Sequence, residues 1–104
     1  KVVARLATEK WNANGNCCVM VGATYPEELS AVRAIVGDMP ILTAGIGAQH
    51  GDLAHAIQAG KDSRGRGFII NSSRSVIFAS NGGDFAEVAR QKATELGGAI
   101  RGSL

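Results

Sequence analysis

Short apolar runs alternate with amphipathic stretches along the whole chain, and this order constrains the fold more than any other feature. Apolar runs occur at residues 17–21, 41–42 and 68–70, and a stretch with helical spacing of its apolar residues follows each one. The first run is apolar at every position, as is typical of a parallel strand covered on both faces. Strands that alternate with helices favour a parallel sheet with right-handed crossovers. Since a further helix is expected ahead of the first strand, the predicted order is one helix followed by three βα units.

Spacing and capping signals place the helices. A capping box formed by Thr24 and Glu27 is expected to open the second helix, and Asp52 and Asp84 are expected to cap the third and fourth. The first helix is predicted over residues 2–12, with these apolar side chains on its buried side: Val3, Leu6, Ala7 and Trp11.

The number of βα units bears on the class of α/β fold. A flavodoxin-like open sheet of this size usually begins with a strand, whereas this chain begins with a helix. A (β/α)8 barrel typically needs roughly 250 residues, so the 104 residues here amount to less than half of one. In such barrels the loops after strands seven and eight often bind phosphate. In this chain the two loops with the strongest chemical signal, residues 43–52 and 71–75, follow the last two predicted strands. We therefore expect residues 1–104 to form a single partial-barrel domain, the C-terminal part of a (β/α)8 TIM barrel without its N-terminal strands.

Composition and charge exclude several classes of partner. Eleven basic and nine acidic residues give a net charge of +2 and are spread along the chain. This mixture is too even for nucleic-acid binding or for attachment to an anionic membrane. No apolar stretch approaches the roughly 20 residues of a membrane span. We therefore expect neither nucleic acid nor a membrane as a partner.

The two cysteines, Cys17 and Cys18, are adjacent within the first apolar run. Neighbouring side chains of a strand point to opposite faces, so a disulfide between them is strained and is not expected. Spaced sets of cysteines and histidines are absent from the sequence, and a metal site is not expected either. The pattern predicts buried, reduced thiols in a cytoplasmic protein.

Two loops carry the strongest chemical signal. Residues 43–52 (TAGIGAQHGD) follow the second apolar run, and residues 71–75 (NSSRS) follow the third. Close backbone approach at glycines, together with a fixed guanidinium, is what a phosphate requires. The pair of loops therefore predicts a site for an anionic ligand. Taken alone, Arg74 is equally compatible with a surface ion pair, and Gly45 and Gly47 are equally compatible with ordinary turns.

Three segments, in their order and spacing, closely resemble the C-terminal part of orotidine 5′-phosphate decarboxylase of the bacterial type. The resemblance extends from the first helix to at least Ala93. The segments that carry it are Val21-Gly22-Ala23-Thr24, Gly45-Ile46-Gly47-Ala48-Gln49 and Asn71-Ser72-Ser73-Arg74.

The resemblance implies roles for particular residues. Gln49 would bridge the phosphate and the pyrimidine edge of the substrate, and Arg74 would form the principal ion pair with the phosphate. A planar guanidinium suits this task because it binds two oxygens at once. Backbone N–H groups around Ser73 and a short helix beginning near Ser75 would complete the anion site. The candidate substrate- and phosphate-binding residues are Ala44, Gly45, Gly47, Gln49, Ser73 and Arg74.

The resemblance also implies what the chain lacks. The family's catalytic lysine and aspartates come from a DxKxxD motif on earlier strands, and this sequence has no such motif. Lys61 and Asp62 precede a strand instead of following one, so no catalytic residue is expected in this chain. The complete barrel is expected to decarboxylate orotidine 5′-monophosphate (OMP) to uridine 5′-monophosphate (UMP) in de novo pyrimidine synthesis. This activity implies no cofactor, and the expected partners are an N-terminal barrel half and a second copy in a cytoplasmic homodimer.

A second class of function stays open. Ala44 stands where the family usually has proline, and His50 stands where glycine is common, which leaves the rigidity and closure of the first loop undecided. The alternative is a non-catalytic half-barrel that binds phosphate or a nucleotide, alone or in a symmetric assembly. The two classes differ in whether they need the DxKxxD motif: the lyase requires it from another chain, and the phosphate-binding half-barrel does not. Unless a partner chain supplies it, the chain is predicted to be inactive even with an intact phosphate site.

Overall fold

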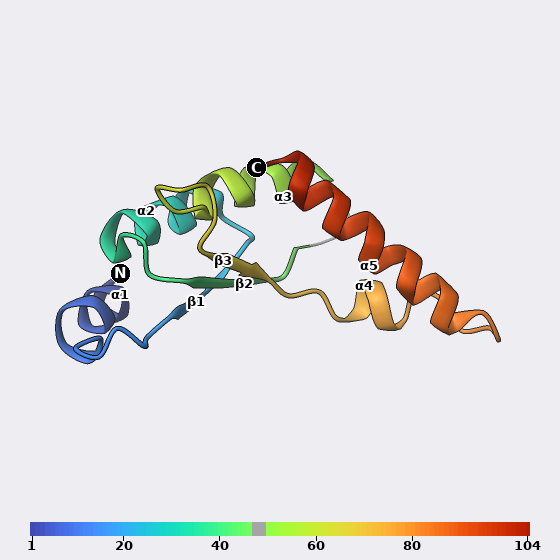
Figure 1. The fold of residues 1–104 in the computed structure, drawn as a ribbon, viewed down its shortest axis with the longest axis horizontal. Coiled ribbons are helices and arrows are strands. Elements are labelled where there is room, and N and C mark those ends of the chain that lie inside the picture. Colours follow the sequence, from blue (N-terminus) through green and yellow to red (C-terminus); the bar gives the residue numbers. More distant parts are fainter. Residues whose placement is uncertain (47–49) are drawn as a thin grey trace.

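The chain forms a three-stranded sheet with helices before, between and after its strands (Figure 1). The computed structural model describes residues 1–46 and 50–104, and of residues 50–52 it describes the backbone. The predicted order, one helix followed by three βα units, is confirmed, and a short helix is added after the last strand. The elements are α1 (Val2–Leu6), the π-helical turn η1 (Ala7–Trp11), β1 (Val19–Gly22), α2 (Pro26–Val36), β2 (Ile41–Ala44), α3 (His50–Gly60), β3 (Phe68–Ile70), α4 (Arg74–Ile77) and α5 (Phe85–Gly102).

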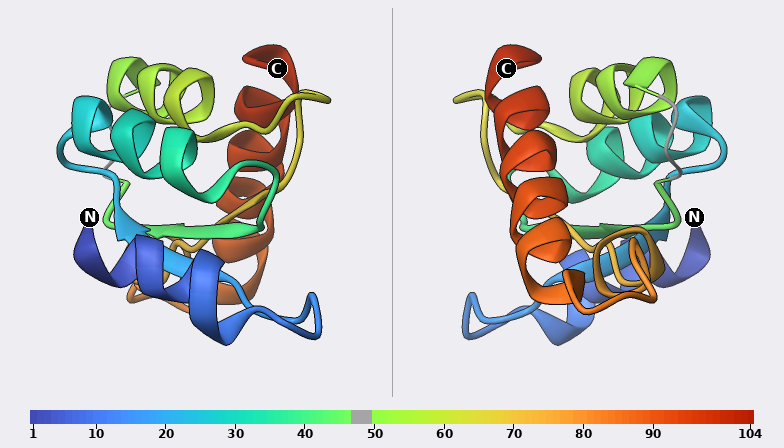
Figure 2. Two further views of the ribbon diagram at one scale, coloured as in Figure 1. Left: turned by 90° about the vertical axis from the view of Figure 1, so that its left-hand side faces the viewer. Right: turned by 90° about the vertical axis from the view of Figure 1, so that its right-hand side faces the viewer.

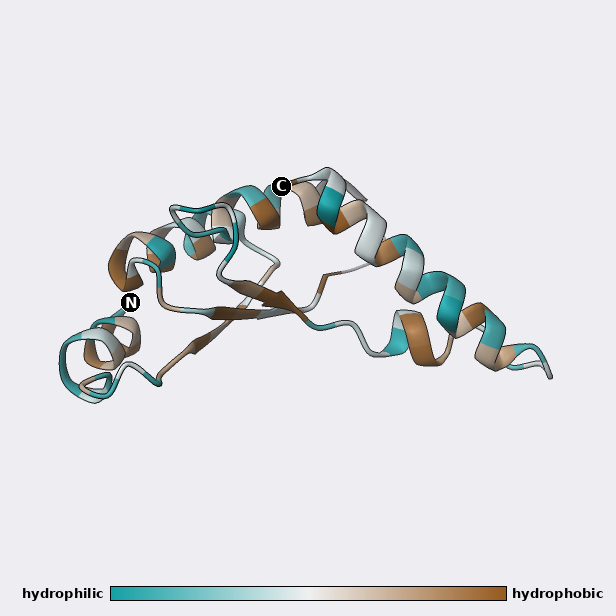
Figure 3. Ribbon diagram, in the orientation of Figure 1, coloured by the Kyte–Doolittle hydropathy of each residue, from teal (hydrophilic) through white to brown (hydrophobic). Residues whose placement is uncertain are grey.

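The three strands are parallel and lie in the order β1-β2-β3. Helices α2 and α3 lie side by side and cover one face of the sheet (Figure 2). On the other face Met20, Leu42 and Ile69 form one row across the strands, and Met20 and Ile69 are 67% and 62% exposed. The prediction that the first strand is covered on both faces is therefore wrong, because the described helices pack against one face only. Figure 3 shows that the strands are nonetheless apolar.

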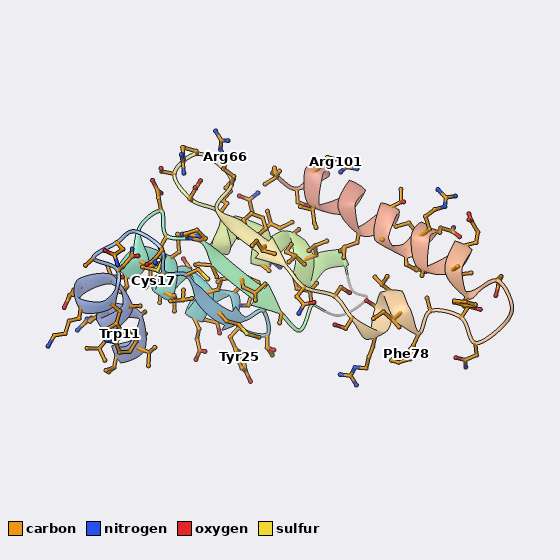
Figure 4. All side chains as sticks on the ribbon, turned by 60° about the horizontal axis from the view of Figure 1, so that its bottom comes forward. Trp11, Cys17, Tyr25, Arg66, Phe78 and Arg101 are labelled. Atoms are coloured by element: carbon orange, nitrogen blue, oxygen red, sulfur yellow. The ribbon has the colours of Figure 1, made fainter. Side chains whose placement is uncertain are left out.

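The cysteines precede β1 instead of lying within it. The N–H of Cys17 donates to Asn12 Oδ1 at 2.8 Å, and its thiol donates to the Trp11 carbonyl at 3.3 Å; Figure 4 shows Trp11 and Cys17 at this end of the molecule. Cys17 is half-buried and Cys18 is exposed, and both are free thiols. The predicted burial is therefore wrong for Cys18, because the strand begins only at Val19.

The core lies between the sheet and the pair α2 and α3. Leu29 of α2, Ile41 of β2 and Ile57 of α3 are completely buried. Burying a side chain of this size contributes roughly 1.5–3 kcal/mol, so these contacts between layers hold the βα units together.

The first helix buries Ala7 as predicted and half-buries Leu6, but the prediction is wrong for Val3 and Trp11. Ala4 and Ala7 join the core, whereas Val3 and Trp11 are 63% and 56% exposed. The turn η1, which is wider than an α-helical turn, shifts the angular position of Trp11, whereas Val3 lies before η1 and is exposed because Ala4 takes the buried position in α1. The small alanines also allow α1 to approach α2 closely.

The capping box at α2 does not form. The N-cap of α2 is Tyr25, without a side-chain cap hydrogen bond. Reciprocal capping needs the glutamate three residues after the cap, and with Tyr25 as cap Glu27 stands one position too early. Pro26 lies in the first turn, and Gly37 ends the helix with a φ of 59°; proline is common at the start of a helix and glycine just after its end.

The other two predicted caps also differ in detail. Helix α3 begins at His50, so Asp52 lies inside the helix instead of at its cap. Asp84 is the N-cap of α5, but it caps no helix N–H with its side chain. Its carboxylate accepts a hydrogen bond from Ser80 Oγ at 2.6 Å instead.

Helix α5 makes the molecule elongated. It packs on α4 near its start and meets α3 near its end, where Gln58 Nε2 donates to the Ser103 carbonyl at 2.7 Å. The extents are 50 × 23 × 21 Å with a radius of gyration of 15.2 Å, against about 13 Å for a compact chain of this length. In the described part of the chain, no helix is long and apolar enough to cross a membrane.

Arg33 joins three elements at the end of the sheet where the strands begin. Its guanidinium donates to the carbonyls of Gly37 and Met39 at 2.7 and 2.6 Å, to Gly60 at the end of α3, and to Gly67 just before β3 at 3.0 Å. Desolvation lowers the pKa of this guanidinium, and the four carbonyls replace the water it has lost. Arg33 therefore fixes the register between the ends of α2 and α3 and the start of β3.

A tight loop built around Asp62 leads into β3. Oδ1 of Asp62 accepts the N–H groups of Arg64 and Arg66 at 2.8 and 3.0 Å, and Oδ2 pairs with the Arg64 guanidinium at 3.2 Å. The Arg66 N–H contributes most to holding the pKa of this carboxyl below its ordinary value. The loop ends at Gly67, whose carbonyl accepts the Ile41 N–H at 3.0 Å. Asp62 is therefore a structural residue at the amino end of the strands.

Replacing Gly67 by alanine is expected to destabilise the fold by about 2–5 kcal/mol. Gly67 has a φ of +78°, and an added Cβ would lie 2.5 Å from Asp62 Oδ2. The left-handed backbone costs an alanine about 1–2 kcal/mol, and overpacking adds about 1–3 kcal/mol. Gly65→Ala is the matched control, because Gly65 has a φ of +75° with nothing within 4 Å of an added Cβ. Equal losses in the free energy of unfolding in urea for the two variants would contradict the contact with Asp62.

Candidate functional site

The carboxyl ends of the three strands are tied together at one edge of the sheet. The Ala23 N–H, just after β1, donates to the Ala44 carbonyl at 3.0 Å, and the Asn71 N–H, just after β3, donates to the Thr43 carbonyl at 2.9 Å. These two bonds extend the parallel ladder beyond the strands on both sides of β2. The loops after β2 and β3 therefore start side by side, as parallel strands require.

A hollow of about 420 Å³ lies between these two loops, lined by residues 44–46 and 71–75. Of the candidates from the sequence, Ala44, Gly45, Ser73 and Arg74 line it. The other two, Gly47 and Gln49, lie outside the described residues. The structure thus brings together the two loops that the sequence singled out.

Arg74 is the cation among the described residues that line the hollow. It is exposed and is the first residue of α4. Within the described ranges the ion pairs join other side chains, namely Arg64 with Asp62, Arg90 with Glu87, and Lys92 with Glu95. The alternative that Arg74 is a partner in a surface ion pair has no support in these contacts.

The backbone around Arg74 offers further donors. Across the portion of the chain that the structure describes, the N–H groups of residues 72–75 donate no hydrogen bond. Ser73 is the N-cap of α4 without a side-chain cap bond, and its carbonyl accepts the N–H groups of Val76 and Ile77 at 3.1 and 2.8 Å. The short helix expected near Ser75 thus begins one residue earlier. Unbonded N–H groups beside a guanidinium form a site for an anion.

The backbone of the first loop also fits an anion site. Gly45 has a φ of +81°, a conformation that favours glycine. Gly45 itself therefore places no side chain between its backbone and the hollow. A ligand can approach the chain closely here.

The described lining of the hollow holds no group for acid–base chemistry. Its lining residues are alanine, glycine, isoleucine, asparagine, serine and arginine, and none of these is a general acid or base near neutral pH. Among the described residues, no three His, Cys, Asp or Glu side chains gather as metal ligands. The described lining residues are therefore suited to holding an anion, and none of them supplies an acid or a base.

Parallel strands with helices on one face, and a loop site at their carboxyl ends, define this chain as part of a (β/α)8 barrel. No protein-family model matches it. The orotidine 5′-phosphate decarboxylase of Janthinobacterium sp. (strain Marseille) is 52% identical over 98 residues, which are 94% of this chain and 36% of that relative. The orotidine 5′-phosphate decarboxylase of Bordetella petrii is 48% identical over 101 residues, which are 96% of this chain and 37% of that relative.

Solved structures agree with the sequence comparison. The OMP decarboxylase of Leishmania donovani is 32% identical with a TM-score of 0.72, over 95% of this chain and 36% of that protein. The UMP synthase of the same organism is 37% identical with a TM-score of 0.73, over 94% of this chain and 21% of that protein. Along nearly its whole length the chain is thus similar to the C-terminal portion of orotidine 5′-phosphate decarboxylase, and it spans about a third of the curated relatives it matches. The resemblance and the barrel fold expected from the sequence are confirmed.

Proposed function

We propose that this chain is the C-terminal part of a lyase that converts OMP to UMP in de novo pyrimidine synthesis, and that it binds the phosphate group of the nucleotide. One observation carries the proposal: the two loops that resemble the family border a single hollow, with Arg74 as its cation. A hollow of about 420 Å³ has room for a phosphate and part of a nucleoside.

The roles proposed for the individual residues follow from their chemistry. Arg74 forms the bidentate ion pair with the phosphate, and N–H groups around Ser73 and Arg74 complete its coordination. Gly45 and Gly47, next to Ala44, let the backbone approach the ligand. Gln49 bridges the phosphate and the pyrimidine edge. For Gly47 and Gln49 the support is the family resemblance alone, since both lie outside the described residues.

The reacting groups are proposed to come from an N-terminal part of the barrel. The open face of the sheet supports this, because its apolar row of Met20, Leu42 and Ile69 needs a cover that the described helices do not provide. In a (β/α)8 barrel this face is filled by side chains from the other strands. Residues 1–104 would then be one partial-barrel domain. A cytoplasmic homodimer that works without cofactor completes the proposal, supported by the family resemblance.

The test uses a completed barrel, in which residues 1–104 replace the matching portion of the Janthinobacterium sp. decarboxylase. We expect it to bind UMP at least about 100-fold more tightly than uridine, because each hydrogen bond to a charged group contributes about 1.5–3 kcal/mol. Titration calorimetry measures both affinities. Equal affinities for UMP and uridine would contradict the proposed phosphate site.

A further inference from the structure

Two serines on either side of Arg74 are hydrogen-bonded to each other through their hydroxyl groups. Ser72 Oγ and Ser75 Oγ form this bond, and either atom can be the donor. Both residues line the hollow, as does Arg74. The bond therefore closes a small ring of backbone and side chain around residues 73–74.

This pairing differs from what serines usually do at the start of a helix. A serine near a helix N-terminus commonly accepts a backbone N–H of the first turn with its hydroxyl. Here Ser73, the N-cap, has no such bond, and the hydroxyls of Ser72 and Ser75 are engaged with each other. The hydroxyl pair therefore stabilises the loop, and neither hydroxyl accepts a hydrogen bond from the N–H groups next to Arg74.

The Ser72–Ser75 hydrogen bond restricts the backbone conformation of residues 73–74 and so the direction in which Arg74 leaves the loop. Arg74 follows the N-cap and is exposed, and its carbonyl accepts the Phe78 N–H at 3.0 Å. The Ser72–Ser75 hydrogen bond joins the residues that flank Ser73 and Arg74 in the chain. The N–H groups of Val76 and Ile77 also donate to the Ser73 carbonyl, so the backbone on both sides of Arg74 is hydrogen-bonded. An anion site of this kind gains affinity when its donors are held in place before the ligand arrives.

We propose that the Ser72–Ser75 hydroxyl pair is a positioning device that holds Arg74 and the neighbouring N–H groups ready for a phosphate monoester dianion. The inference rests on the proposed function of this site and adds to it two residues that do not themselves carry the charge. The pair acts on the phosphate end of a nucleotide and has no part in recognising its base or sugar.

The experiment measures binding of UMP and of uridine to the completed barrel and its variants. Ser72→Ala and Ser75→Ala are each expected to weaken UMP binding about three- to tenfold, the effect of one neutral hydrogen bond, and to leave uridine binding unchanged. Because the two hydroxyls act as one unit, the double variant should lose no more than either single variant. Ser75→Thr keeps the hydroxyl and should retain the affinity of the unmodified barrel.

Each result decides the inference. Unchanged UMP affinity in both alanine variants would overturn it, and so would an equal loss of UMP and uridine affinity, which indicates a general structural defect. Independent, additive losses would show that the hydroxyls do not act as a pair and would also overturn it. An unmodified barrel that binds UMP and uridine equally would instead contradict the proposed function, so the two failures are distinguishable.

Discussion

Replacing Arg74 by alanine in the completed barrel is expected to weaken UMP binding by about 2–5 kcal/mol, the usual cost of removing one partner of a charge pair with a bound anion. That is a loss of affinity of roughly 30-fold to several thousandfold. Arg74 is the cation among the described residues that line the hollow, and the described neighbours of Arg74 offer only neutral donors. The loss should be confined to phosphate-bearing ligands, because uridine has no group that pairs with a guanidinium.

Two further variants sharpen this test. Arg74→Lys keeps the charge but loses the two-pronged geometry, and it should recover only part of the affinity. Arg66→Ala is the matched control: Arg66 is exposed in the loop before β3, at the opposite end of the strands, and Figure 4 shows it far from Phe78 at the end of α4. Calorimetry that finds the same UMP affinity for Arg74→Ala and Arg66→Ala would rule out the role of Arg74.

The sequence was sufficient for the order of elements and for the two loops of the site. Apolar runs and helical spacing are local signals, and local signals found β2, β3 and the order of the helices around them. The position of the loops follows from one further rule, that parallel strands end at the same edge. This rule was enough to bring residues 44–46 next to residues 71–75.

The parts that failed depend on contacts distant in the sequence. The apolar pattern of residues 17–21 indicates that both faces of a strand contact apolar groups. It does not indicate which segment of the chain supplies those groups. Met20 is therefore exposed here despite the pattern. Arg33 was missed because its acceptors at Gly60 and Gly67 are 27 and 34 residues away. A buried carboxylate such as Asp62, bonded to N–H groups that follow it, has the same sequence signature as a solvated turn.

The largest effect is expected in turnover. Residues 1–104 alone should decarboxylate OMP no faster than buffer does, because they lack the DxKxxD motif and the described lining of their hollow contains no acid, base or lysine. The completed barrel should exceed the uncatalysed rate by at least about a millionfold, the lower range for enzymes. Release of CO2 from carboxyl-labelled OMP measures both rates.

The same assay separates the two classes of function. Binding energy from a remote phosphate lowers the barrier at the reacting carbon only if the phosphate site and the catalytic groups hold one substrate together. Arg74→Ala should therefore reduce kcat/KM of the completed barrel by a factor similar to its loss of UMP affinity. A completed barrel that binds UMP tightly without turnover would favour the non-catalytic half-barrel. Turnover by residues 1–104 alone would overturn the division of labour, because it would require reactive groups that the described lining of the hollow does not contain.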